Sequence, residues 1–212
     1  MGKSVYSIVL DDRVIYSIDA LAARNGTSRS NLINRILAEH LGYVTNENVI
    51  GSIYDSMDKY LSDNTSLILQ ALGSSSLINM RSSIKYKYKP NIRYSLEIIE
   101  DREYIGKLKV SLRSQNSDLL NIIDAFFNVW TNIEIRYAGL KSGEYSIGEG
   151  RYQRLLKAGP GIDYSNYGRS IAGYIDFFDK CLNDFFSLYP VSQETATIET
   201  ERKYINYIHS NK

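Results

Sequence analysis

Residues able to carry catalytic or metal chemistry are few in this chain. It contains one cysteine, Cys181, and two histidines, His40 and His209, so neither an internal disulfide nor a cysteine-based zinc site can form within one chain. Cys181 lies in an apolar helical stretch between Phe178 and Phe185, which predicts a buried, unreactive thiol. We therefore expect no metal, no cofactor and no enzymatic activity.

Two glycine-rich stretches and one group of carboxylates also fail as catalytic motifs. The sequence KAGPG at 157–161 lacks the residue order of a phosphate-binding loop, and GEYSIGEG at 143–150 lacks the spacing of a dinucleotide-binding fingerprint. Asp176, Asp179 and Asp184 fall on one predicted helix. We expect these three carboxylates to be solvated on the surface of that helix.

A basic row offers the first hint of a binding surface. Lys85, Lys87 and Lys89 alternate with tyrosines, and Arg93 follows. Such a row can form a nucleic-acid surface. More often it is the solvated face of a sheet whose lysines protect an edge strand. Residues 81–113 hold nine basic and four acidic residues, a net charge of +5, whereas the whole chain carries only +1. Any attraction to nucleic acid must therefore be local.

The first 45 residues predict one strand and two helices. The alternating stretch Lys3–Leu10 predicts a strand, and Asp11 or Asp12 is placed to cap the helix that follows. Gly26 supplies a left-handed helix end, and Ser28 is a good N-cap for the second helix. The two helices are expected over 13–25 and 28–41.

So small a unit cannot bury three apolar faces alone. A lone strand at the start of a chain also lacks a hydrogen-bonding neighbour in its own sequence. Pairing with the same strand of a second copy solves both problems, because it forms an antiparallel ribbon with four helices behind it. Alternate residues of the strand point to opposite faces of that ribbon. Tyr6, Ile8 and Leu10 would face the helices, and Val5, Ser7 and Val9 would face outward.

Residues 3–43, KSVYSIVLDDRVIYSIDALAARNGTSRSNLINRILAEHLGY, resemble a ribbon-helix-helix domain of the MetJ/Arc/CopG type. The resemblance rests on the strand ending in LDD, the helix end IDALAARNG and the segment GTSRSNLI, and it covers about a fifth of the chain. It implies a dimer whose ribbon enters the major groove of DNA. A dimerisation ribbon that touches no DNA is the simpler alternative.

The resemblance also implies roles for single residues. Outward strand residues would contact base edges, and the start of the second helix would hold a phosphate of the DNA backbone. Two of the three outward residues are valines, which contact a thymine methyl group but cannot distinguish purines, so we expect modest sequence specificity. The base-reading residues implied are Val5, Ser7 and Val9. The phosphate-binding residues implied are Lys3, Thr27, Ser28, Arg29 and Ser30.

The remaining four fifths of the chain resemble no family that we can name. Residues 46–80 predict a helical linker, with an apolar seam from Ile50 to Leu72 that serves either core packing or a second dimer contact. Residues 81–212 predict an α+β domain with a small antiparallel sheet. Strands are expected within 83–98 and 104–113, an irregular stretch over 139–168, and helices over 119–137, 171–189 and 193–209.

The sequence thus favours an α+β protein whose domains span 1–45, 46–80 and 81–212. The predicted function is a dimeric DNA-binding transcriptional regulator, expected to act as a repressor in the cytoplasm, on the nucleoid. The alternatives are an antitoxin or partition factor whose C-terminal region binds a protein, and a small-molecule effector site lined by Trp130 and Tyr137. No apolar run reaches the roughly 18 residues that a membrane span requires.

Overall fold

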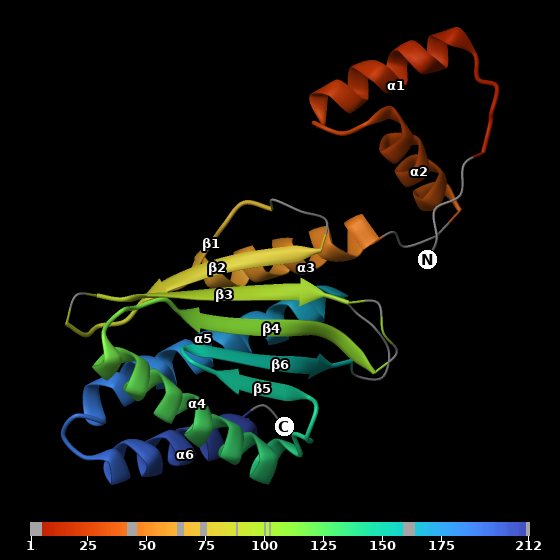
Figure 1. Cartoon of the computed structure of the whole chain (residues 1–212). Helices are drawn as coiled ribbons and strands as arrows, with labels where there is room; N and C mark the ends of the chain where they lie inside the picture. The colour runs from red at the N-terminus through yellow and green to blue at the C-terminus, as the bar shows by residue number, and fades with distance from the viewer. Residues whose placement is uncertain are drawn as a thin grey trace. The chain divides into compact units, whose positions relative to one another are not determined.

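The computed structural model describes residues 6–41, 46–62, 66–72, 76–87, 89–99, 101, 103–158 and 164–210. It divides the chain into two units, Met1–Asn48 and Val49–Lys212 (Figure 1). The described residues form six helices and one six-stranded antiparallel sheet, which confirms the predicted α+β class. The whole sheet follows the two N-terminal helices.

The N-terminal unit holds two helices, α1 (Asp12–Arg24) and α2 (Arg29–His40). The Asp11 side chain caps α1 by accepting a hydrogen bond from the backbone N–H of Arg13 at 2.8 Å, as predicted. Residues 6–10 have no regular secondary structure. The expected strand is therefore not formed in the single chain, and its first residues, Lys3 and Val5 among them, lie outside the described residues. A strand exists only against a hydrogen-bonding partner.

The second unit contains the sheet, whose strands run in the order β1-β2-β3-β4-β6-β5. Each neighbouring pair is antiparallel. The strands are β1 (Ile68–Leu69), β2 (Leu77–Ser83), β3 (Asn91–Ile98), β4 (Tyr104–Leu112), β5 (Tyr145–Gly148) and β6 (Arg151–Lys157). The helices are α3 (Asn46–Leu61), α4 (Ser117–Ala138), α5 (Tyr164–Leu188) and α6 (Gln193–Ser210).

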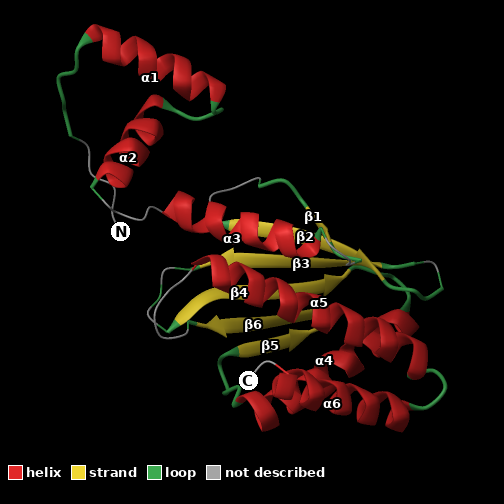
Figure 2. Ribbon diagram, turned by 180° about the vertical axis from the view of Figure 1, so that it is seen from behind, coloured by secondary structure: helices red, strands yellow, loops and turns green. Residues whose placement is uncertain are grey.

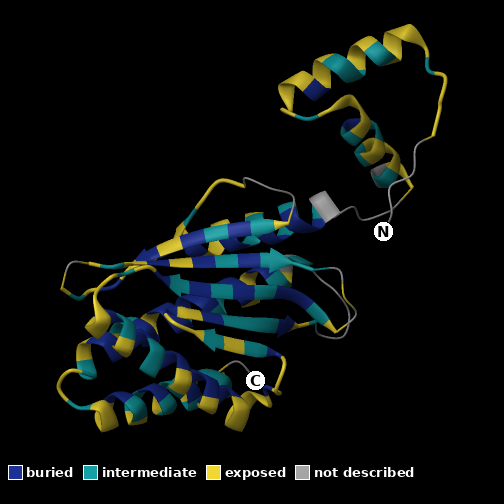
Figure 3. Ribbon diagram, viewed as in Figure 1, coloured by how far each residue is buried: buried dark blue, intermediate teal, exposed yellow. Residues whose placement is uncertain are grey.

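The two faces of the sheet differ in burial. Side chains alternate along each strand between buried and accessible positions, as the banding of the strands in Figure 3 shows. Helices α3 and α5 lie on one face: they are behind the sheet in Figure 1 and in front of it when the molecule is turned in Figure 2. The buried face is apolar and includes Ile78, Met80, Ile92, Tyr94, Leu96, Leu108, Val110, Leu112, Tyr152 and Leu156.

An aromatic cluster fills the space between the sheet and α4, α5 and α6. Trp130 is fully buried, with ring centroids 4.8 Å from Phe178, 5.3 Å from Tyr204 and 5.5 Å from Phe126. Aromatic pairs at such distances add to the stability gained from burial alone. Trp130 is thus part of the packed core rather than the wall of an open effector pocket.

Helix α3 shows whether the apolar seam that begins at Ile50 packs into the core or is left free for a second dimer contact. Ile50, Ile53, Met57 and Leu61 are buried in the core of the second unit, which confirms core packing for this part of the seam. The seam does not continue as a helix, because Ile68 pairs in β1 with Arg81 of β2. The range predicted as a linker, 46–80, therefore contributes a helix and two strand segments to that unit.

Several strand predictions were wrong in position. Lys85 and Lys87 lie in the turn between β2 and β3, where Tyr86 packs against Phe186, so the lysine row is not a strand face. Strand β2 had been missed, and so had the β5–β6 hairpin inside the stretch taken as irregular. Gly150 makes that hairpin with a φ of 60°, and a side chain there would meet the Leu112 carbonyl oxygen at 2.6 Å. The helices expected over 119–137, 171–189 and 193–209 are confirmed.

Candidate nucleic-acid interface

A tight corner joins α1 to α2 and places the start of α2. The Thr27 N–H donates to the Ala22 carbonyl at 3.0 Å, and the Gly26 N–H donates to the Ala23 carbonyl at 3.3 Å. Gly26 has a φ of 60°, the left-handed conformation that this helix ending requires. The predicted helix end is confirmed, and the chain reverses within the four residues before α2.

Ser28 caps α2, as the sequence predicted. Its Oγ accepts a hydrogen bond from the Asn31 N–H at 3.2 Å, and its carbonyl accepts from the Leu32 N–H at 3.0 Å. Ser28, Arg29 and Ser30 are exposed, and Thr27 is half-buried. The positive end of the helix dipole and two hydroxyl groups thus face solvent at one point, where an anion would be stabilised.

Arg29 is already paired in the free chain. Its Nε donates to Asp19 Oδ1 at 2.6 Å and its Nη2 donates to Asp19 Oδ2 at 2.5 Å. These hydrogen bonds lower the pKa of the Asp19 carboxyl and raise that of the Arg29 guanidinium. Both side chains remain accessible: 42% of the Asp19 side chain and 53% of the Arg29 side chain are exposed. Solvent therefore screens the pair. Phosphate would compete with Asp19 for the same guanidinium.

Sequence reasoning had missed Asp19 as the partner of Arg29. The two residues are ten positions apart, on different helices. Their contact depends on the angle at the Gly26 corner, which spacing along the chain does not reveal.

The proposed base-reading segment is uncovered in the described chain. Ser7 is exposed, Val9 is 99% exposed, and Tyr6 and Ile8 are 83% and 58% exposed. Apolar side chains at these levels cost free energy unless a partner covers them. Nothing among the described residues occupies the face that the ribbon dimer would bury.

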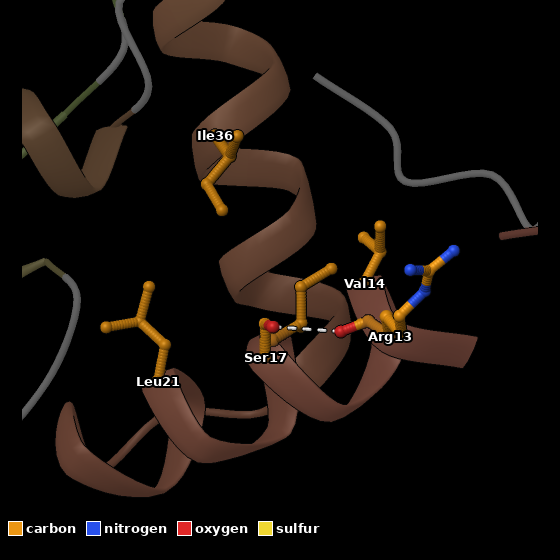
Figure 4. Close-up of a pocket in the computed structure, with 6 residues that line it drawn as sticks. Arg13, Val14, Ser17, Leu21 and Ile36 are labelled. Carbon is orange, nitrogen blue, oxygen red and sulfur yellow. Dashed lines mark hydrogen bonds between the residues drawn. The ribbon is translucent and has the colours of Figure 1, made fainter. Parts of the chain in front are cut away.

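A groove lies between α1 and α2 of the same unit. It encloses about 380 Å³ and is lined mainly by apolar side chains. Figure 4 shows Val14 and Leu21 of α1 and Ile36 of α2 around it, with the Ser17 hydroxyl turned back to the Arg13 carbonyl at 2.8 Å. The lining is Arg13, Val14, Ser17, Ile18, Leu21 and Ile36.

In the second unit, a buried carboxylate that sequence reasoning did not single out lies at the centre of a polar cluster. Glu134 of α4 is fully buried and accepts hydrogen bonds from the hydroxyls of Tyr152 at 2.8 Å and Tyr174 at 2.7 Å. It also pairs with Arg154, whose guanidinium lies 4.8 Å from the centre of the Tyr174 ring. Burial raises the pKa of Glu134, opposed by Arg154. Such a network stabilises one arrangement of the core.

The expectation of solvated carboxylates on α5 was wrong for two of the three. Asp179 is fully buried and accepts from the Tyr94 hydroxyl at 2.7 Å and the Ser66 hydroxyl at 2.8 Å. Asp176 is 95% buried and pairs with Lys180 at 2.7 Å. Partners on other segments of the unit satisfy the buried Asp179 carboxylate. Asp176 pairs only with Lys180 of α5 itself, and its second carboxylate oxygen, Oδ1, is buried without a hydrogen-bond partner among the described residues.

Cys181 is buried, as predicted, and burial raises the pKa of its thiol to about 12. At neutral pH it is protonated and a poor nucleophile. Within the described ranges, no three His, Cys, Asp or Glu side chains lie close enough together to hold a metal ion. None of the described helices is long and apolar enough to cross a bilayer.

No protein-family model matches the chain, and neither a curated protein nor a solved structure matches it. The site must therefore be argued from its own geometry.

Proposed function

We propose that the N-terminal units of two chains associate through residues 3–10 into a ribbon-helix-helix dimer that binds duplex DNA and regulates transcription, as a repressor. The observation that carries the proposal is the apolar surface of residues 6–41, which nothing in the described chain covers. It lies in the same small unit as a capped, exposed helix start suited to phosphate.

The need for a partner follows from burial. Among the apolar residues of this unit whose burial is described, only Ala22 and Leu32 are buried. Two buried side chains cannot offset the entropy of ordering some thirty-five residues, since one fully buried aliphatic side chain contributes about 1.5–3 kcal/mol. The apolar residues left exposed are Tyr6, Ile8, Val9, Val14, Tyr16, Leu21, Ile36, Leu37 and Leu41.

The polar residues fit contact with DNA. In an antiparallel ribbon Ser7 lies between Val5 and Val9 on the outward parity, so its hydroxyl is the one directional contact to base edges. The start of α2, with Thr27, Ser28 and Ser30, would bind a backbone phosphate, and Lys3 lies near the ribbon's end. Arg29 would exchange Asp19 for phosphate. The expected specificity is modest, and the site of action is the nucleoid.

The rival function, an antitoxin or partition factor, predicts a C-terminal region that orders only on a protein partner. The second unit instead has an extensive core of its own. This favours a regulator with a folded sensing or oligomerisation domain, whose effector is of unknown chemistry.

The test is DNA binding by the full chain, measured by fluorescence anisotropy with duplex DNA over a range of salt concentrations. Arg29→Ala should weaken binding about tenfold on every sequence, since it removes a phosphate contact. Ser7→Ala should mainly change sequence preference. Arg35→Ala removes the same charge from the middle of α2 and serves as the matched control. Equal losses for Arg29→Ala and Arg35→Ala would overturn the assignment of the phosphate site.

A further inference from the structure

The accessible face of the sheet carries a row of arginines that is costly for the fold. Cα partners across the strands join Arg81 of β2 to Arg93 of β3, Arg93 to Ser111 of β4, and Ser111 to Arg151 of β6. Directly opposed residues of an antiparallel pair point to the same face. Three guanidinium groups and one hydroxyl therefore form a single line across four strands.

Among the described residues, the arginines of this row have no acidic partners. Arg81, Arg93 and Arg151 are exposed, and no carboxylate of a described residue lies within ion-pair distance of them. The acidic residues of this face are used elsewhere: Glu97 pairs with Lys109 at 3.0 Å, and Glu144 pairs with Lys157 at 3.1 Å. Like charges placed directly opposite, as Arg81 and Arg93 are, destabilise a sheet. A cost to folding that no internal contact offsets points to an external anion.

Spacing and shape indicate what kind of anion. Neighbouring strands are about 4.8 Å apart, so the row from Arg81 to Arg151 extends about 14 Å across the sheet. Arginine binds phosphate through two parallel hydrogen bonds. Next to the row lie the polar side chains Asn79, Ser95 and Gln153. The Ser95 hydroxyl donates to Asn79 Oδ1 at 2.6 Å, so the amide N–H groups of Asn79 and Gln153 would be the neutral donors to a sugar-phosphate backbone.

The composition of the arginine row and of the row next to it disfavours binding of single strands. Proteins that bind single strands stack the bases on aromatic rings, but the described partners in the arginine row and in the adjacent row, from Asn79 to Ser146, include no Phe, Tyr or Trp. The largest cluster of aromatic rings in this unit lies in its core. A polar, basic surface without rings fits the outside of a duplex, which is read there only as a line of phosphates.

We propose that Arg81, Arg93 and Arg151 form a second, sequence-independent binding surface for the phosphate backbone of duplex DNA. The inference rests on the proposed function, because it adds a backbone contact in the second unit to the N-terminal contact of the same chain. Tethering two contacts in one chain raises the effective concentration of the second.

The test uses the full chain and a duplex of arbitrary sequence, with binding measured between about 50 and about 200 mM KCl. The variant R81Q/R93Q/R151Q should bind at least about tenfold more weakly at the lower salt, and the slope of log K against log salt should become shallower by about 2.7 per chain, 0.9 for each lost contact. The matched control K59Q/K141Q/R169Q removes three exposed, unpaired charges from outside the sheet and should leave the slope unchanged. Thermal unfolding confirms that both variants are folded.

The outcomes separate this inference from the proposed function. If the arginine variant binds like the unaltered chain while Arg29→Ala does not, the second surface is refuted and the N-terminal site stands. If the arginine variant is impaired and Arg29→Ala is not, the N-terminal phosphate site is refuted and the second surface stands. Equal losses in both triple variants would reduce the effect to net charge and overturn the inference. Arginine-dependent binding to vesicles of phosphatidylserine and phosphatidylcholine, with duplex affinity retained in the variant, would assign the surface to membranes instead.

Discussion

The two units of this chain handle their apolar residues in opposite ways. In the C-terminal unit, the largest side chains, such as Trp130, Phe126 and Phe178, are fully buried within one unit. Among the described residues of the N-terminal unit, two apolar residues are buried and nine large ones are exposed. The C-terminal unit therefore has a core within one chain, whereas under the proposed ribbon dimer the N-terminal unit would gain its core only from a second chain. Stability in the N-terminal unit should depend on protein concentration, and stability in the C-terminal unit should not.

The largest expected effect tests the self-sufficient core. Phe178 is fully buried, with ring centroids 5.2 Å from Phe126 and 4.8 Å from Trp130. Replacing it with alanine should lower the free energy of unfolding of the C-terminal unit by about 3–5 kcal/mol, at every protein concentration. Denaturant unfolding followed by Trp130 fluorescence measures this. Tyr16→Ala, at a residue 75% exposed, is the control and should have no effect on that transition.

Association of the N-terminal units is probed at Ile36. This side chain is 42% exposed and lines the apolar groove. Ile36→Asp should weaken self-association by at least about tenfold, because a charge would be buried in the contact. Sedimentation equilibrium measures the dissociation constant. The matched control is Asn34→Asp, which places the same charge at an exposed polar position of α2. A chain that is monomeric before any substitution would remove the basis of the ribbon dimer.

The same contrast explains what the sequence predicted well. Local signals act within about five residues: the Gly26 helix end and the Ser28 cap were predicted at the right position, and Asp11 was one of the two caps predicted for α1. Helix α4 was predicted equally well, because its apolar stripe repeats over six turns. These features depend on spacing along the chain, which the sequence displays directly.

Features that depend on distant partners could not be predicted. Glu134 and Arg154 form an ion pair between α4 and β6, and nothing in their 20-residue separation indicates it. The lysine row was assigned to a strand by its alternation, but the turn begins at Ile84, and Arg81 and Arg93 become neighbours across it. The arginine row exists only once four strands are in register. Register is set by turns and bulges that a single sequence specifies weakly.

A substitution at Arg81 should have smaller and opposite effects on the stability of the C-terminal unit and on its affinity for DNA. Arg81→Glu places a carboxylate directly opposite Arg93, so it should raise the free energy of unfolding by about 0.2–1 kcal/mol, while weakening binding to duplex DNA. The free energy of unfolding and the DNA affinity of Arg81→Gln should each lie between those of the unaltered chain and of Arg81→Glu. Denaturant unfolding and anisotropy on the same samples provide the comparison. A variant that loses stability would mean that Arg81 has a structural partner on the face.

The smallest effect concerns the pair that links α1 to α2. Arg29 lowers the pKa of Asp19 below its ordinary value of 3.8. At a pH above 3.8 the ionised carboxylate therefore stabilises the folded corner between α1 and α2. The contribution is lost as the pH falls through the lowered pKa. Carbon-13 NMR should therefore show Asp19 titrating below 3.8, and Arg29→Ala should return the midpoint to the ordinary range. Because Asp19 and phosphate compete for one guanidinium, Asp19→Asn should also tighten DNA binding a few-fold. Weaker binding by Asp19→Asn would mean instead that Asp19 holds Arg29 in the position from which it meets the phosphate.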